Sequence, residues 1–226
     1  MLNFEKDVAK IGGWLTKSEA EFLYDSAKKI SMHGKIVEIG SWKGRSTICL
    51  GLGAKDGKGA TVYAIDPHSG SSEQRRWFGK VDTFNEFLNN IKEAGVGKYI
   101  IPIKKTSEEA AAGFDGEADF VFVDGAHEYK YVRKDYELWF PKLTDGGLIA
   151  FHDCWHTSGV HFLTALVLLT STNVRKPRLL DTLTIMEKVS RNSFLDRLYN
   201  IIFIVFRLLF GWIGTLKINL TGTVTK

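Results

Sequence analysis

Five short apolar runs, separated by longer amphipathic segments, constrain the fold more than any other feature of the sequence. The runs cover residues 35–39, 61–65, 99–103, 119–123 and 147–151. Each is almost continuously apolar, which is typical of a strand that is covered on both faces of a sheet. Segments with the apolar spacing of helices fill the gaps, at 46–54, 81–94, 107–112 and 129–140. This alternation predicts a doubly wound, Rossmann-like α/β fold with a parallel sheet and right-handed crossovers.

The segments before and after these runs extend the predicted fold. A helix is predicted at 17–30, with an apolar face that includes Phe22, Leu23 and Ala27. Beyond the fifth run, residues 160–169 have a helical pattern, and residues 178–189 predict one or two strands that end the sheet with an antiparallel strand. We therefore predict a domain over residues 1–190 and an apolar helical tail over residues 191–226.

Length and composition fit this single domain. The chain has 226 residues, of which 44% are apolar and 25% are charged. Its two cysteines, Cys49 and Cys154, are too few for a disulfide framework, and its polar first residues lack the apolar core of a signal peptide. A cytoplasmic location is therefore expected.

The formal net charge of +4 is not spread along the chain. Residues 1–190 contain 25 lysines and arginines and 25 acidic residues, so the whole excess lies in residues 191–226. A nucleic-acid-binding surface needs clustered basic side chains to neutralise phosphates. The neutral body of the chain therefore argues against a nucleic-acid partner.

The turn after the first predicted strand has the features of a cofactor site. Gly40 and Gly44 lie in this turn, where a helix start offers free N–H groups beyond the carboxyl end of a strand. Asp66 ends the second strand, where a carboxylate can accept hydrogen bonds from both hydroxyls of a ribose. Glu38, inside the first strand, suits the cationic amino-acid end of a ligand. The glycine spacing differs from the Gly-x-Gly-x-x-Gly of NAD-binding turns, which counts against an NAD-dependent oxidoreductase.

A second group of polar residues follows the fourth and fifth predicted strands. Asp124 and His127 follow one strand, and His152 and Asp153 follow the next, so the four side chains should converge at one edge of the sheet. Carboxylates suit Mg²⁺, whereas imidazole suits Mn²⁺, Fe²⁺ or Zn²⁺ better, so His152 is either a ligand or lies behind the metal. His127 is a candidate general base because imidazole titrates near neutral pH. Helix capping is the alternative role for these aspartates and for His127.

Four ordered motifs together resemble a known family. They cover residues 37–46, 65–67, 123–129 and 146–153. The sequence resembles class I S-adenosylmethionine-dependent methyltransferases, and within them the small-molecule O-methyltransferases that include macrolide-sugar methyltransferases and cephalosporin-hydroxylase-type proteins. The resemblance covers roughly residues 10–190, and four motifs in order are more selective than any single one. It implies S-adenosylmethionine as cofactor and a hydroxyl of a small molecule, sugar or glycan as methyl acceptor.

The resemblance also implies roles for individual residues. It places Glu38, Gly40 and Ser41 near the methionine part of the cofactor, with Gly44, Ser46 and Asp124 in the same binding site. It places Asp66 on the ribose, His68 beside it, and Thr106 and Ser107 near the adenine. The implied metal ligands are Asp124, His152 and Asp153, for Mg²⁺ or else Mn²⁺ or another divalent ion, and the implied base is His127. The family has an acidic pair where this chain has His152-Asp153. A non-catalytic cofactor-binding or assembly protein of the same fold is the main alternative.

The C-terminal tail is apolar and flanked by cations. Nearly every residue from 198 to 216 is apolar, with Arg207 in the middle and other basic residues on both sides. The arginine argues against a membrane-spanning helix. A helix over 194–216 that lies at a membrane surface explains the composition, with Arg207 reaching the lipid headgroups. Self-association into a homo-oligomer and packing into the core are the alternatives.

Overall fold

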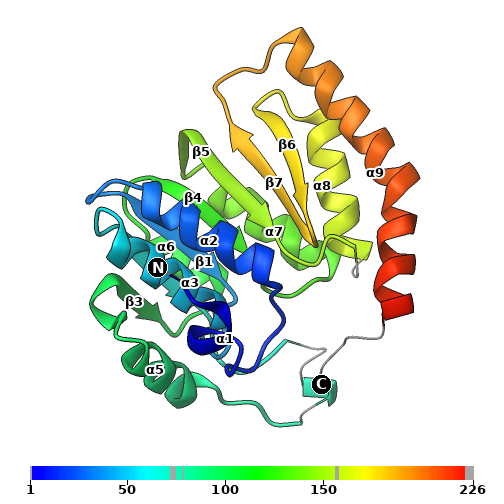
Figure 1. The fold of residues 1–226 in the computed structure, drawn as a ribbon. Coiled ribbons are helices and arrows are strands. Elements are labelled where there is room, and N and C mark those ends of the chain that lie inside the picture. Colours follow the sequence, from blue (N-terminus) through cyan, green and yellow to red (C-terminus); the bar gives the residue numbers. More distant parts are fainter. Residues whose placement is uncertain (1, 72–74, 78, 156–157, 222–226) are drawn as a thin grey trace.

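The protein folds around one mostly parallel sheet (Figure 1). The computed structural model describes residues 2–71, 75–77, 79–155 and 158–221, with side chains as far as Leu208. Within this part of the chain the sheet has seven strands, in the order β3-β2-β1-β4-β5-β7-β6. The first five strands are parallel, and β7 is antiparallel to both of its neighbours. The strands are β1 (Lys35–Ile39), β2 (Thr61–Ile65), β3 (Ile100–Ile103), β4 (Ala118–Val123), β5 (Leu143–Phe151), β6 (Val174–Leu180) and β7 (Leu183–Lys188).

Helices cover both faces of the sheet. The described helices are α1 (Phe4–Asp7), α2 (Lys17–Lys29), α3 (Arg45–Asp56), α5 (Phe84–Glu93), η1 (Gly97–Tyr99), α6 (Ser107–Gly113), α7 (Tyr129–Trp139), α8 (Ser158–Thr170) and α9 (Phe194–Thr221). Alternate residues of each strand enter two apolar clusters. Phe120 and Phe122 of β4 pack with α2 and α3, whereas Val121 and Val123 pack with α7 and α8. The central strands β1 and β4 are therefore buried on both sides, which explains their continuous apolar sequences.

The structure confirms the predicted fold class. β1 and β2 have the predicted bounds, and β3 and β4 differ by one residue at their first positions. β5 begins at Leu143, four residues before the prediction, because Leu143 pairs with Ala118 across a register shift that precedes Phe120. Residues 174–188 form two strands, so the antiparallel end of the sheet is a hairpin.

The order in which strands are added to the sheet reverses between β1 and β4. β2 and β3 are added on one side of β1, and β4 and β5 on the other. The crossovers after β1 and β2, formed by α3 and α5, cover one face, while α6 and α7 cover the other. The carboxyl ends of β1 and β4 are neighbours at this reversal. Ligands of doubly wound sheets bind in the crevice that opens at such a point. The fold therefore directs attention to the residues that follow β1, β2, β4 and β5.

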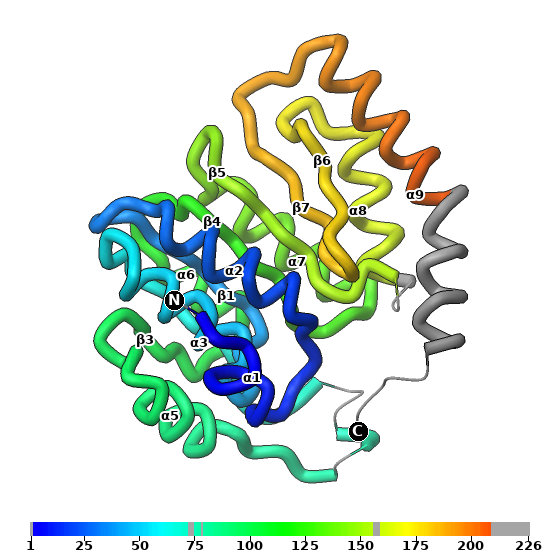
Figure 2. The backbone as a smooth tube through the Cα atoms, in the orientation of Figure 1, coloured from blue at the N-terminus to red at the C-terminus, as the bar shows by residue number. Residues whose placement is uncertain are grey.

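α9 packs against α8 and β6 (Figure 2). Phe203 is buried in the same apolar cluster as α8, and the Asn200 amide donates to the Val174 carbonyl at 3.1 Å. The prediction that Arg207 reaches lipid headgroups is wrong, because this side chain is only 1% exposed. Its guanidinium instead donates to the Thr164 hydroxyl at 2.7 Å and to the His161 carbonyl at 2.8 Å. The Arg207 side chain therefore points into the protein, and these oxygens are the partners of its charge.

None of the described helices combines the length and the apolar composition needed to cross a membrane.

Candidate functional site

The predicted site residues meet at the carboxyl edge of the sheet. The last residues of β1, β2, β4 and β5 stand level, since Ile39 pairs with Ile65 and Val123, and Val123 pairs with Phe151. The four residues that directly follow these strands therefore lie in one row along this edge of the sheet. These residues are Gly40, Asp66, Asp124 and His152.

Gly40 lets the turn after β1 pack directly on the end of β4. Its φ is +90°, and a Cβ built on it would lie 2.1 Å from the carbonyl oxygen of Asp124. No other residue fits, because even alanine would overlap this backbone and would be strained at that φ. The glycine therefore fixes the distance between the cofactor turn and Asp124.

Glu38 lies behind the cofactor turn. Its carboxylate is completely buried and accepts hydrogen bonds from the hydroxyls of Ser46 and Thr47, each at 2.5 Å. Burial raises the pKa of Glu38 to about 8, and the two hydroxyl donors offset only part of that effect. The hydroxyl of Ser46, in the first turn of α3, is therefore already used in a hydrogen bond to Glu38.

Asp66 joins the turn after β1 to the loop after β2. One carboxylate oxygen accepts from the Trp42 amide at 2.8 Å and the other accepts from the His68 amide at 2.6 Å. Each oxygen has a further lone pair, so the carboxylate can still accept hydrogen bonds from a ligand. Asp66 thus orders both loops at the place where the sequence predicts a ribose.

Two buried polar atoms beside Asp66 have no hydrogen-bond partner among the described residues. They are the Ser41 hydroxyl oxygen and Nε2 of His68. The His68 side chain is 1% exposed, and its Nδ1 lies 2.9 Å from the Thr83 hydroxyl. Burial lowers the pKa of His68. An unsatisfied buried polar group costs about 1–3 kcal/mol, so this pair marks a place where a polar ligand would be bound.

Thr106 and Ser107 lie at the start of α6, after β3. The Thr106 hydroxyl caps the helix together with Glu109, and the side chain is exposed. The Ser107 hydroxyl accepts from the indole N–H of Trp139 at 2.9 Å. Both hydroxyls therefore have structural partners, whatever further contact they make.

Asp124, His152 and Asp153 form a compact group whose oxygen and nitrogen atoms lie within 4.8 Å of one another. Nε2 of His127 is 3.5 Å from an Asp153 oxygen and 3.9 Å from an Asp124 oxygen. Burial alone would raise the pKa of Asp124, but the neighbouring His152 and His127 outweigh it and lower that pKa. Asp124, Asp153 and His127 are each about one-fifth exposed, so the group opens toward solvent.

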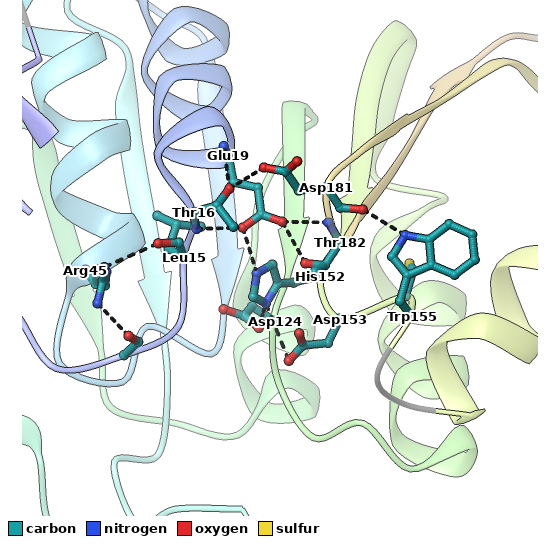
Figure 3. A network of polar contacts seen from close by, with 12 residues as sticks. Leu15, Thr16, Glu19, Arg45, Asp124, His152, Asp153, Trp155, Asp181 and Thr182 are labelled. Atoms are coloured by element: carbon teal, nitrogen blue, oxygen red, sulfur yellow. Dashed lines mark hydrogen bonds and ion pairs between the residues drawn. The ribbon is translucent and has the colours of Figure 1, made fainter. Parts of the chain in front are cut away.

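His152 has a second carboxylate partner that the sequence analysis missed. Nδ1 of His152 lies 3.0 Å from an Asp124 oxygen, and Nε2 lies 3.3 Å from an oxygen of Glu19 in α2 (Figure 3). Burial works against protonation of His152, but the surrounding carboxylates raise its pKa well above the usual value. The imidazole therefore faces a carboxylate at each ring nitrogen.

Glu19 is fully buried and accepts hydrogen bonds from three segments of the chain. Besides His152, its donors are the Thr16 amide at 2.9 Å, the Thr182 amide at 2.9 Å and the Thr182 hydroxyl at 2.7 Å. Burial opposes ionisation, yet these donors and His152 together lower the pKa of Glu19 to about 2. The sequence shows only the Thr16-x-x-Glu19 capping box, because residues 152 and 182 are distant along the chain.

Two further contacts fix the segments around the site. A Cβ on Gly159, at the start of α8, would lie 2.2 Å from the carbonyl oxygen of His127, so α8 packs directly on the His127 segment. At the other side, Arg45 donates to the carbonyls of Gly13 at 2.6 Å and Leu15 at 3.3 Å. The N-terminal segment is thereby held against the cofactor turn.

A comparison with protein families agrees with this geometry. A family profile described as a methyltransferase domain matches residues 37–154, which is more than half of the chain. The matched range runs from within β1 past the end of β5 and contains every site residue predicted from the sequence, whereas Glu19 lies outside it. The chain belongs to this methyltransferase family.

Two curated relatives are similar to part of the chain. It is 31% identical over 121 residues to the uncharacterized protein y4gI of Sinorhizobium fredii, and 29% identical over 120 residues to the uncharacterized protein R132 of Acanthamoeba polyphaga mimivirus. The matches cover 53% and 52% of this chain but 13% and 50% of the two relatives. The chain thus spans at most half the length of these relatives.

Solved structures share the fold. The O-methyltransferase TomG from Streptomyces achromogenes, in complex with S-adenosylmethionine, has a TM-score of 0.57 at 15% identity, over 82% of this chain and 85% of its own. The methyltransferase MycE of the mycinamycin biosynthetic pathway, in complex with Mg, S-adenosylhomocysteine and mycinamycin VI, has a TM-score of 0.53 at 18% identity, over 81% of this chain and 52% of its own. This likeness shows a shared fold, and together with the family match it confirms the predicted methyltransferase domain.

Replacing Glu19 tests its role in holding the site together. Glu19→Gln keeps the side-chain size but removes the charge and places an amide donor among four donors. We expect the free energy of unfolding to fall by about 3–5 kcal/mol, the usual cost of breaking a buried charged network. Glu21→Gln on the exposed side of the same helix is the matched control, with an expected change below about 0.5 kcal/mol. Equal urea midpoints for the two variants would contradict the role.

The raised pKa of Glu38 predicts a pH dependence of stability. The folded protein holds this proton more tightly than the unfolded chain, so the free energy of unfolding falls as the pH rises from about 5 to about 8. Glu38→Gln mimics the protonated form and removes that fall. The variant should match the wild type near pH 5 and exceed it near pH 8, by on the order of 3 kcal/mol. Urea unfolding across this range measures the difference, with exposed Glu93→Gln as control; a difference independent of pH would reject the assignment.

Proposed function

We propose that this chain is an S-adenosylmethionine-dependent O-methyltransferase that methylates a hydroxyl of a small molecule, sugar or glycan. The observation that carries the proposal is a pair of buried polar atoms, the Ser41 hydroxyl and His68 Nε2, that have no hydrogen-bond partner among the described residues. They follow β1 and β2 at the same edge of the sheet where Asp124, His127 and Asp153 follow β4 and β5. A polar ligand and a proton-accepting group would therefore meet in one crevice.

The residues along this edge suit the cofactor. Gly40 and Gly44 add no side chain at the two ends of the turn before α3, and the Ser41 hydroxyl between them has no partner among the described residues and can bind the methionine part. Asp66 keeps lone pairs for the ribose hydroxyls, and Thr106 and Ser107 lie after β3, where an adenine would reach. S-adenosylmethionine supplies a methyl group activated by its sulfonium charge.

The acidic group suits a divalent metal. Asp124 and Asp153 offer carboxylate oxygens, and Nδ1 of His152, which faces both of them, would be the third ligand if it were unprotonated. Glu19 would then accept from Nε2 of His152, an arrangement that commonly orients a metal-bound histidine. Mg²⁺ or Mn²⁺ held there would supply a Lewis acid for the acceptor hydroxyl.

The chain's own part in the reaction is to orient the acceptor hydroxyl and to remove its proton. His127 is the proposed base, since its imidazole borders the two carboxylates and its segment is fixed by Gly159. Proton removal by a positioned base contributes about 10²–10⁴-fold to a rate. TomG is an O-methyltransferase, and MycE is a methyltransferase in complex with mycinamycin VI, which supports this class of acceptor. Both cysteines are buried and free, which suits the proposed cytoplasmic location.

Ligand titration of the purified protein tests the cofactor. By calorimetry, S-adenosylhomocysteine should bind and NAD⁺ should not. Ser41→Ala should weaken S-adenosylhomocysteine binding about 3–10-fold, the value of one neutral hydrogen bond. It should not lower the melting temperature, because the hydroxyl has no hydrogen-bond partner among the described residues. Ser26→Ala, at the opposite edge of the sheet, is the control. Tight NAD⁺ binding, or unchanged affinity in Ser41→Ala, would reject the proposal.

Metal titration tests the acidic group separately. Mn²⁺ binding can be followed by electron paramagnetic resonance, with Mg²⁺ as competitor. Asp153→Asn should weaken Mn²⁺ at least about tenfold, because one charged ligand is lost. Asp145→Asn, at an exposed position near the start of β5 and so at the opposite end of that strand, should leave the affinity unchanged. A wild-type protein that binds neither ion would leave His127 to act without a metal and would rule out the metal-assisted form.

A further inference from the structure

A helix on the surface of a globular protein usually buries apolar side chains and exposes polar ones. The described part of α9 shows the reverse arrangement. Its buried positions include two polar side chains, Asn200 and Arg207, whose hydrogen bonds go to α8, β6 and β7. From Phe194 to Leu208 its exposed positions are apolar or aromatic, apart from Arg197. They include Phe194, Leu195, Ile202, Val205, Phe206 and Leu208, each between 49% and 79% exposed.

This apolar face continues onto the neighbouring helix. α8 packs against α9 and exposes Phe162 and Leu169, at 57% and 56%. Single exposed apolar residues are ordinary, but a row of them on two adjacent helices marks a surface that is covered when the protein works. The inward position of Arg207 keeps its charge out of this row, so the exposed side chains of α9 from Leu198 to Leu208 are apolar or aromatic.

The charges around this face indicate what covers it. The excess of +4 lies entirely within residues 191–226, and Arg191 and Arg197 are exposed at the start of α9. The only acidic residue of this segment, Asp196, is engaged with the Ser193 hydroxyl and amide at the helix start. Two copies of the chain joined through this face would bring cations against cations. An anionic lipid surface would complement them.

We propose that the outer face of α9 docks on an anionic membrane surface, with the helix lying in the plane of the interface. The apolar side chains enter the boundary between headgroups and acyl chains, and the basic residues contact lipid phosphates. The attachment is peripheral, in keeping with the lack of a spanning helix among the described ones. It does not depend on the proposed methyl transfer.

Vesicle flotation of the full chain tests the proposal. The probes are phosphatidylcholine vesicles with and without about 30% phosphatidylglycerol. Wild-type protein should float with the anionic vesicles, and added salt should weaken but not abolish binding, because the apolar part is not screened. The double variant Ile202→Gln/Phe206→Gln should reduce the bound fraction at least about tenfold. The control Met32→Gln/Ile101→Gln, which changes exposed apolar residues elsewhere, should float like wild type.

The other outcomes overturn the proposal. Wild-type protein that stays in solution with both vesicle types excludes a membrane partner. A dimer seen by light scattering that Ile202→Gln/Phe206→Gln converts to monomer, without vesicle binding by either protein, assigns the face to a second copy. Equal flotation of the variant and wild type would place the membrane contact elsewhere. Unchanged circular dichroism and S-adenosylhomocysteine affinity in both variants confirm that the fold is intact, since all four residues are exposed.

Discussion

The arrangement at the carboxyl edge of the sheet depends on one buried carboxylate, that of Glu19. Its four donors come from the start of α2, the end of β5 and the turn between β6 and β7. A charge that is completely removed from water is tolerable only when such donors and an opposite charge replace the water. His152 supplies that charge and in turn contacts Asp124. A residue of the N-terminal helix, outside the range matched by the family, therefore orients the polar group at the reacting edge.

Glu19 and Glu38 show how surroundings decide the ionisation of a buried carboxyl. Both are completely buried, yet the pKa of Glu19 is about 2 and that of Glu38 is about 8. Glu19 faces an imidazolium and two backbone amides, whereas Glu38 faces only the neutral hydroxyls of Ser46 and Thr47. Charge-assisted hydrogen bonds overcome the cost of burial, and neutral ones do not. The edge thus contains one fixed negative charge and one carboxyl that is close to neutral.

The sequence predicted the sheet and the convergence of its site residues, because both follow from local rules. Continuous apolar runs mark strands that are buried on both faces, and parallel strands place the residues that follow them, such as Asp66, Asp124 and His152, at one edge. What it missed depends on contacts between distant segments. The partner of His152 is 133 positions away in the sequence, at Glu19. Arg207 lies in an apolar segment, and only the hydroxyls of Thr164 and Thr184 explain why it points inward. The roles of the site residues remain proposals that ligand binding will test.

The contact between Gly40 and Asp124 has a consequence for how ligands bind. Since even a methyl group would overlap the Asp124 carbonyl, the cofactor turn and the end of β4 are in direct backbone contact and have no space in which to come closer or shift past each other. The ordering of these two segments is completed during folding, so a ligand that bridges them meets groups already in position. Less conformational entropy is lost at the moment of binding, and stiffness acquired in folding is converted into affinity.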